Sequence, residues 1–105
     1  MEIEKKELDI EWEGRKEKVI IRKLDYGEDG DITSQSLQTK YIGTMPQVTM
    51  DTVKFRQLYL WKSLMKAPFK FDTFNDILRL PKKLAKILEK EIIDFNELEE
   101  EKKEN

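Results

Sequence analysis

An alternating segment near the N-terminus constrains the fold more than any other feature of the chain. Apolar and acidic side chains alternate there, in the order Leu8, Asp9, Ile10, Glu11, Trp12 and Glu13. This alternation places the apolar side chains on one face of an extended strand. Gly14 then allows a tight turn before the β-branched residues 19–21. We therefore predict a β-hairpin within residues 6–25, which needs a cover because an isolated hairpin is only marginally stable.

The second half of the chain predicts the helices that would supply this cover. Asp51 or Thr52 stands at the N-cap position of a helix over about residues 52–66. Pro68 ends that helix, because its ring and missing N–H cannot continue the hydrogen-bond ladder.

A short helical turn and a last helix follow this stop. Asp72 or Thr73 can cap the turn, and Pro81 suits the first position of the last helix. Apolar residues at three- and four-residue spacings give the last helix a single apolar stripe. The stripe comprises Leu84, Ile87, Leu88, Ile92, Phe95 and Leu98.

The stretch between the hairpin and these helices is polar and rich in turn residues. Residues 26–31 hold two glycines and three acids, which indicates a turn or a poorly formed helix start. Residues 33–40 fit either a short helix or irregular structure. Residues 43–49 include Pro46 and predict a loop.

These elements together predict an α+β fold, with an N-terminal β-hairpin or small antiparallel sheet followed by a helical bundle of about three helices. A chain of 105 residues fits one domain, which we place at residues 1–98. Residues 99–105 have almost nothing to bury, so we expect a charged, disordered tail there.

The residue types that are missing exclude most enzymes. The chain has no cysteine and no histidine, which removes thiolate chemistry, the commonest general base and the commonest metal ligands. It also lacks a phosphate-binding glycine loop and a nucleophile elbow. Acids at positions 25, 28, 29 and 31 could clamp a hard cation, but their spacing fits no EF-hand. We therefore expect no enzyme activity, no catalytic residue, no metal and no cofactor.

The N-terminal residues lack the basic flank and apolar run of a signal peptide, and no segment has the ~20 apolar residues that span a bilayer. We expect a cytoplasmic protein of the host cell with no membrane partner.

Charge is distributed unevenly along the chain. Residues 51–90 hold ten Lys or Arg against four Asp or Glu, whereas residues 91–105 hold two against seven. A basic patch attracts phosphate, so weak nucleic-acid binding is one alternative. Solvated helix faces, with the acidic end as an internal counter-charge, explain the same pattern, and we favour this interpretation.

Aromatic side chains crowd the segment from residue 53 to residue 74. At 100° per residue the apolar positions of its helix cover more than one stripe. Leu58, Trp61, Leu64 and Met65 fit a core helix, whereas the surrounding aromatic residues exceed what so small a core can bury. We predict that this segment binds a protein partner through Phe55, Tyr59, Trp61, Met65, Phe69 and Phe71.

A pattern spread over most of the chain resembles the small tail assembly chaperones of long-tailed phages and related proviruses. Residues 11–28 are similar to the opening hairpin of that family, with its Leu-x-Tyr-Gly-Glu ending at residues 24–28. Residues 60–69, with Lys-Ala-Pro-Phe at 66–69, and the segments 80–84 and 92–98 resemble its later helices. The stretch from residue 30 to residue 50 departs from the pattern.

This resemblance implies a non-catalytic chaperone that binds apolar helices of the tape-measure protein and helps tail-tube subunits to assemble in a phage or provirus tail. Adaptable Met and aromatic side chains suit such a role. A structural tail or head–tail connector component that forms an oligomeric ring is the alternative. A homo-oligomer is compatible with both hypotheses.

Overall fold

The computed structural model describes residues 3–98, and within them it confirms the α+β class with four helices and strands in two sheets. The order of elements along the chain is β1 (Lys5–Trp12), β2 (Arg15–Arg22), α1 (Tyr26–Ser36), β3 (Leu37–Ile42), β4 (Met45–Met50), α2 (Thr52–Ser63), β5 (Leu64–Lys66), α3 (Phe74–Leu78) and α4 (Lys82–Phe95). The predicted tail at residues 99–105 lies outside the described residues.

The predicted N-terminal hairpin is confirmed as β1 paired antiparallel with β2. Leu8 lies opposite Val19, and the strands turn at Glu13 and Gly14, which both have positive φ, as a type I′ turn requires. Leu8 and Ile10 are buried while the acids next to them, Glu7, Asp9 and Glu11, are exposed. β5 adds to the other side of β2, so the three-stranded sheet has the order β1-β2-β5.

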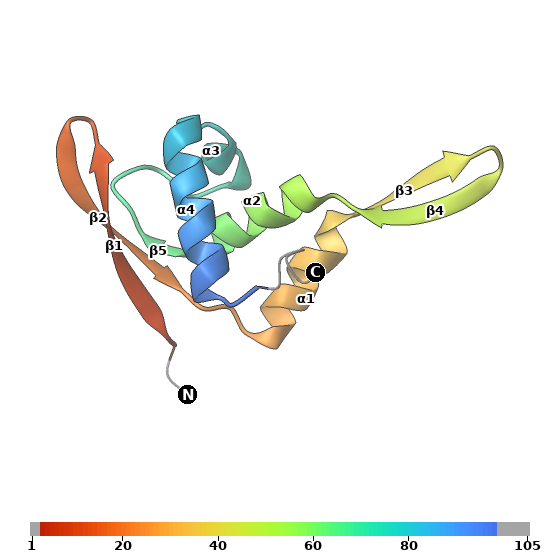
Figure 1. Cartoon of the computed structure of the whole chain (residues 1–105), viewed down its shortest axis with the longest axis horizontal. Coiled ribbons are helices and arrows are strands. Elements are labelled where there is room, and N and C mark those ends of the chain that lie inside the picture. The colour runs from red at the N-terminus through yellow and green to blue at the C-terminus, as the bar shows by residue number, and fades with distance from the viewer. Residues whose placement is uncertain (1–2, 99–105) are drawn as a thin grey trace.

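The core lies where this sheet meets α2 and α4 (Figure 1). The sheet contributes Leu8, Ile10, Val19, Ile21 and Leu64, and the helices contribute Ile32, Leu58, Tyr59, Leu60, Ile77, Leu84, Leu88 and Ile92. Phe69, from the connector before α3, completes the buried set. The helices therefore supply the cover that the N-terminal hairpin needs.

The predicted caps are present, but two helix ends differ from the prediction. The side chain of Asp51 accepts a hydrogen bond from the Lys54 N–H, and Thr73 caps α3. α2 ends at Ser63, before Pro68, because residues 64–66 become extended and pair with β2. Pro81 is the N-cap residue of α4 instead of its first helical residue.

The stretch at residues 26–50 was predicted least well. Its first part is a full helix, α1, which Asp25 caps. The predicted loop at residues 43–49 is wrong, because β3 and β4 form a second hairpin that projects from the body of the molecule (Figure 1). This projection makes the molecule elongated, with extents of 53 × 32 × 29 Å.

Candidate protein interface

The six residues predicted to bind a partner do not form one exposed surface. Tyr59 and Phe69 are buried, so the prediction that they are exposed is wrong. Met65, in β5, is exposed. The other three are partly buried against the core: Phe55, Trp61 and Phe71.

Contacts between aromatic side chains explain why this segment is folded inward. The Phe69 ring lies 5.4 Å from the Trp12 ring and 6.4 Å from the Phe71 ring, between centroids. The Trp61 Nε1–H donates to the Phe71 carbonyl oxygen at 3.0 Å. Trp61 also lies 5.8 Å from the Phe74 ring. The aromatic residues therefore attach the connector before α3 to β1 and α2.

Tyr59 joins α2 to α1. Its hydroxyl donates to Asp29 Oδ2 at 2.8 Å. Burial, and after it this hydrogen bond to a carboxylate, raises the pKa of Tyr59 above its ordinary value. Tyr59 thus serves the packing of two helices.

Six large hydrophobic side chains are exposed on the β3–β4 hairpin, which spans the predicted loop at residues 43–49 and part of the stretch predicted as a short helix or irregular structure: Leu37, Tyr41, Ile42, Met45, Val48 and Met50. In the register of the two strands, Leu37 pairs with Met50, Thr39 with Val48, and Tyr41 with Pro46. Side chains alternate between the faces of a sheet, so these three pairs share one face. Tyr41 is 69% exposed and Val48 63%. This face, which we call the hairpin face, resembles the inner side of a sheet without its cover.

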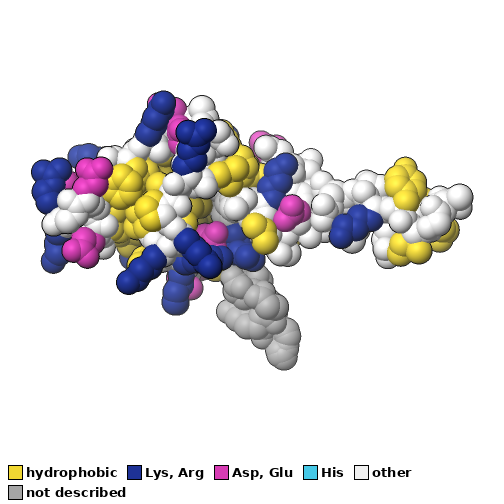
Figure 2. All heavy atoms as spheres, turned by 90° about the horizontal axis from the view of Figure 1, so that it is seen from above, with side chains coloured by type: hydrophobic (Ala, Val, Ile, Leu, Met, Phe, Trp, Pro, Cys, Tyr) yellow, Lys and Arg dark blue, Asp and Glu magenta, His cyan; other side chains and the backbone are white. Residues whose placement is uncertain are grey.

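The opposite side of the hairpin is polar along most of its length. It presents Gln38, Lys40, Gln47 and Thr49. Ile42 and Met45 lie next to the turn and are both exposed, which makes the end of the hairpin apolar on this side as well. Figure 2 shows hydrophobic side chains gathered at this far end of the projection.

The base of the hairpin is joined to the body of the molecule. The Asp51 N–H donates to the Ser36 carbonyl oxygen at 2.8 Å, which holds the first and last residues of the hairpin close together.

At the other end of the hairpin, Gly43, with φ of 65°, occupies the first position of the two-residue turn, where a type II′ turn needs positive φ. A two-stranded hairpin is marginally stable in water. Its exposed apolar face therefore favours a protein partner that covers it.

A period of two was present in the sequence and would have identified this hairpin. Leu37, Thr39 and Tyr41 alternate with polar residues, and Gly43 follows at a turn position. Pro46 suggested a loop. Proline is nevertheless tolerated in an edge strand, because a position that faces solvent does not need the backbone N–H that proline lacks. Both strands of a two-stranded sheet are edge strands.

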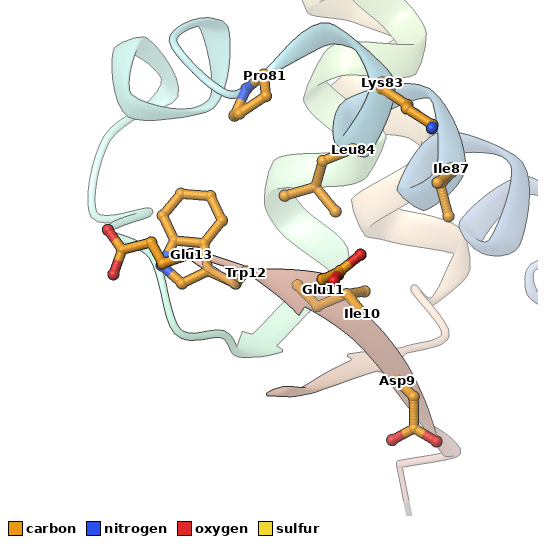
Figure 3. Close-up of a pocket in the computed structure, with 9 residues that line it drawn as sticks. All are labelled: Asp9, Ile10, Glu11, Trp12, Glu13, Pro81, Lys83, Leu84 and Ile87. Carbon is orange, nitrogen blue, oxygen red and sulfur yellow. The ribbon is translucent and has the colours of Figure 1, made fainter. Parts of the chain in front are cut away.

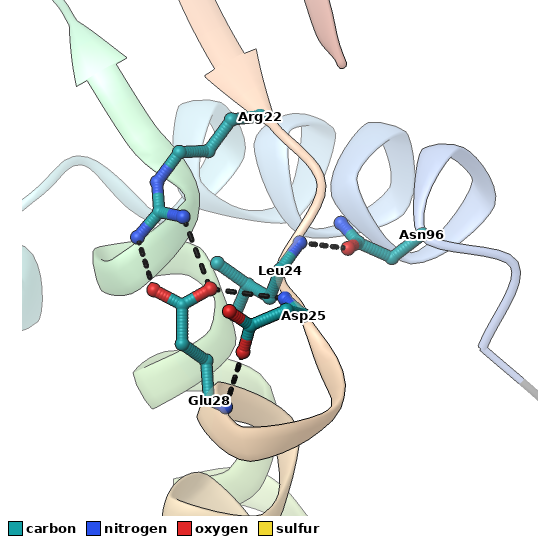
Figure 4. A network of polar contacts seen from close by, with 5 residues as sticks. All are labelled: Arg22, Leu24, Asp25, Glu28 and Asn96. Carbon is teal, nitrogen blue, oxygen red and sulfur yellow. Dashed lines mark hydrogen bonds and ion pairs between the residues drawn. The ribbon is translucent and has the colours of Figure 1, made fainter. Parts of the chain in front are cut away.

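The segment that resembles the family's Leu-x-Tyr-Gly-Glu ending forms a polar network between β2, α1 and α4 (Figure 4). The Arg22 guanidinium donates to both carboxylate oxygens of Glu28, at 3.1 and 2.9 Å. Glu28 and Asp25 each accept from the other's backbone N–H, which makes a capping box at the start of α1. The Leu24 N–H donates to Asn96 Oδ1 at 2.9 Å. This segment fixes the relative positions of three elements.

Three of the four acids in residues 25–31 make structural contacts. Asp25 caps α1, Glu28 pairs with Arg22 and Asp29 accepts from Tyr59. Among residues 3–98, no group of three or more carboxylates is placed to hold a metal ion. None of the helices in this part of the chain is long and apolar enough to cross a membrane.

Several basic residues of the segment 51–90 have partners within the molecule. Arg56 Nε lies 3.4 Å from Glu89, and Lys90 Nζ lies 3.2 Å from Asp94. The Lys62 ammonium group stacks over the Trp61 ring at 4.7 Å. These contacts fit the interpretation of solvated helix faces with internal counter-charges.

A groove lies between β1 and the N-terminal half of α4 (Figure 3), at the opposite end of the molecule from the β3–β4 hairpin (Figure 1). Its volume is about 520 Å³. The side chains of Leu84 and Ile87 point from α4 toward β1, which contributes Ile10 and Trp12. Ile87 belongs to the predicted apolar stripe of α4, yet it is 48% exposed because it borders this opening.

No protein-family model, curated protein or solved structure matches the chain.

Proposed function

We propose that this protein is a non-catalytic assembly chaperone of the tail-assembly type, and that the β3–β4 hairpin is its binding element. One observation carries the proposal: the hairpin face leaves Leu37, Tyr41, Val48 and Met50 exposed on an element that projects from the body. Exposed apolar patches of this kind mark interaction surfaces. The proposal keeps the function that the sequence resemblance implies and moves its site away from the aromatic segment.

An apolar helix is the partner that suits this face. A sheet with one apolar face buries it against a helix or another sheet. Tyr41 and the two methionines, Met45 and Met50, provide large or flexible side chains that adapt to a helix without a fixed pattern. The tape-measure protein, which the resemblance names as the partner, is a long helical protein. Its helices would lie across the hairpin face during assembly of the tail.

Co-purification with the tape-measure protein from the same genome tests this proposal. The double variant Tyr41→Ser/Val48→Ser removes the two most exposed large hydrophobic side chains of the hairpin face while the core stays unchanged, so the variant should lose most of the bound partner. Tyr26→Ser is the matched control, because Tyr26 is 94% exposed and lies at the start of α1. Retention of the partner by the double variant would contradict the proposal. A genome that encodes no tape-measure protein would contradict it as well.

A further inference from the structure

The groove between β1 and α4 is an unfilled apolar surface with an acidic border. Ile10, Trp12, Leu84 and Ile87 line its apolar part. Its charged lining consists of Asp9, Glu11, Glu13 and Lys83. Lys18 pairs with Asp9 at 2.8 Å, so Glu11 and Glu13 supply the remaining negative charge at the border, and Lys83 offsets part of it. An occupant of this groove should therefore be apolar and should carry no negative charge.

The groove also follows an edge of the three-stranded sheet. β1 is an outer strand in the order β1-β2-β5, so within residues 3–98 one side of β1 has backbone groups with no neighbouring strand. Such an edge accepts another strand through main-chain hydrogen bonds. An extended occupant would therefore satisfy both the backbone of β1 and the apolar lining.

The β3–β4 hairpin has the properties that this groove requires. Residues 37–50 contain no carboxylate, although the whole chain holds 22, and their one charged side chain is that of Lys40. The hairpin face and the residues beside the turn are apolar and exposed. Strands of six residues extend ~20 Å, which is long enough to enter a neighbouring molecule while the two bodies stay apart.

The hairpin cannot fill the groove of its own molecule. Figure 1 shows β3 and β4 projecting from one end of the molecule, whereas β1 and α4 lie toward the other end. The longest extent is 53 Å. Any contact between the two surfaces must therefore join different copies, with the hairpin of one molecule facing the groove of the next. An interface between two different surfaces can propagate into rings or chains.

We propose that the β3–β4 hairpin of one copy docks into the β1–α4 groove of a second copy. The inference rests on the proposed function in one respect, since it uses the same hairpin as the binding element. Self-association then covers the hairpin face until a partner protein competes for it. The protein would remain soluble despite the large exposed apolar face.

Residues 99–105 are a weaker candidate for the groove. They hold four glutamates and no apolar side chain, so they match neither the lining nor the charge of its border. A symmetric contact between two hairpins is the other way to cover the hairpin face, and it would leave the groove unused. These two arrangements predict different behaviour of groove variants.

Light scattering after size-exclusion chromatography, over a wide range of concentrations, tests the inference on the full chain. The mass of the wild-type protein should rise with concentration. Two variants should each remain monomeric: Tyr41→Ser/Val48→Ser on the hairpin and Ile87→Glu in the groove. Leu78→Glu is the matched control for the groove variant, because Leu78 and Ile87 are both 48% exposed and Leu78 lies on α3, outside the groove. This control should associate like the wild type.

Mixing the two monomeric variants provides the sharpest result. The hairpin variant keeps an intact groove and the groove variant keeps an intact hairpin, so an equal mixture should form a one-to-one dimer and nothing larger.

Circular dichroism checks that each variant is folded. If Ile87→Glu is not folded, Ile87→Ser replaces it as the groove variant. Three outcomes would overturn the inference: wild-type protein that stays monomeric, a groove variant that associates normally, or a mixture that stays monomeric.

The same variants separate this inference from the proposed function. Ile87→Glu keeps the hairpin, so it should still co-purify with the tape-measure protein. Wild-type protein that binds the tape-measure protein but never associates with itself would overturn the inference alone. Wild-type protein that associates with itself through the hairpin but does not bind the tape-measure protein would overturn the proposed function alone.

Discussion

Arg22 and Glu28 form a two-pronged ion pair, with Nη1–Oε1 and Nη2–Oε2 distances of 3.1 and 2.9 Å, between the end of β2 and the first turn of α1. The pair is partly buried, and Glu28 also accepts a hydrogen bond from the Asp25 N–H. One side chain therefore joins the sheet to the cap of a helix. Parallel hydrogen bonds of this type fix geometry better than a single contact between point charges.

Replacing Glu28 should destabilise the fold because it removes the ion pair and weakens the helix cap. We expect Glu28→Gln to lower the free energy of unfolding by about 1 kcal/mol. Urea unfolding followed by circular dichroism measures the change. Glu7→Gln is the control, since Glu7 is exposed and lies 3.7 Å from Lys18, and it should have no measurable effect. Equal stability of the two variants would show that the Arg22–Glu28 pair does not support the fold.

The same carboxylate predicts how stability depends on pH. The hydrogen bonds from Arg22 lower the pKa of Glu28 below its ordinary value, against the opposing effect of burial. A lowered folded-state pKa gives stability that is fully present above the unfolded-state pKa, about 4.3, and is lost as the pH falls through the folded-state value. The difference in unfolding free energy between wild type and Glu28→Gln should thus be constant near neutral pH and shrink below about pH 4. A difference that grows on acidification would contradict the assignment.

The aromatic residues that looked like partner contacts should behave as core residues. Phe69→Ala removes a buried ring that contacts Trp12 and Phe71, so it should cost about 3–5 kcal/mol of stability. Tyr41→Ala, on the exposed hairpin face, should cost less than about 1 kcal/mol. Chemical denaturation of both variants makes the comparison. Similar losses for the two would mean that the hairpin belongs to the core.

Elements that depend on neighbouring residues could be predicted from the sequence. The alternation of Leu8 and Ile10 with acids, followed by Gly14, is enough to specify the first hairpin and its buried face. Asp51 and Thr73 mark helix starts because a cap acts on an N–H only three residues away. These signals need no knowledge of the rest of the fold.

The exposed surface could not be predicted in the same way, because exposure depends on which elements meet in space. The helical wheel showed that the segment around Tyr59 and Phe69 has more than one apolar side, but α1 and β1 cover those sides from distant parts of the sequence. The hairpin face is the reverse case: it was not predicted to be an exposed apolar surface, and it is one. Pro46 suggested a loop despite the period of two in Leu37, Thr39 and Tyr41, and nothing in the described structure covers the face that these residues form.

The hairpin should be removable without loss of the fold. The hydrogen bond of 2.8 Å between the Asp51 N–H and the Ser36 carbonyl holds its two ends together, so a short Gly-Ser linker can replace residues 37–50. We expect the shortened protein to unfold cooperatively, with the near-ultraviolet signal of its tryptophans retained. It should lose both self-association and binding of the tape-measure protein. A molten shortened protein would show that the hairpin is needed for the fold of the body.

Hydrogen exchange should distinguish the two hairpins of the molecule. In dilute solution, amides of β3 and β4 should exchange faster than those of β1 and β2, because the first pair lacks a covering layer and the second lies on the core. At high concentration, exchange in β3 and β4 should slow together with exchange in β1, since a docked hairpin protects both surfaces. The groove variant Ile87→Glu should show no such slowing. Protection of β3 and β4 without protection of β1 would instead indicate a symmetric contact between two hairpins.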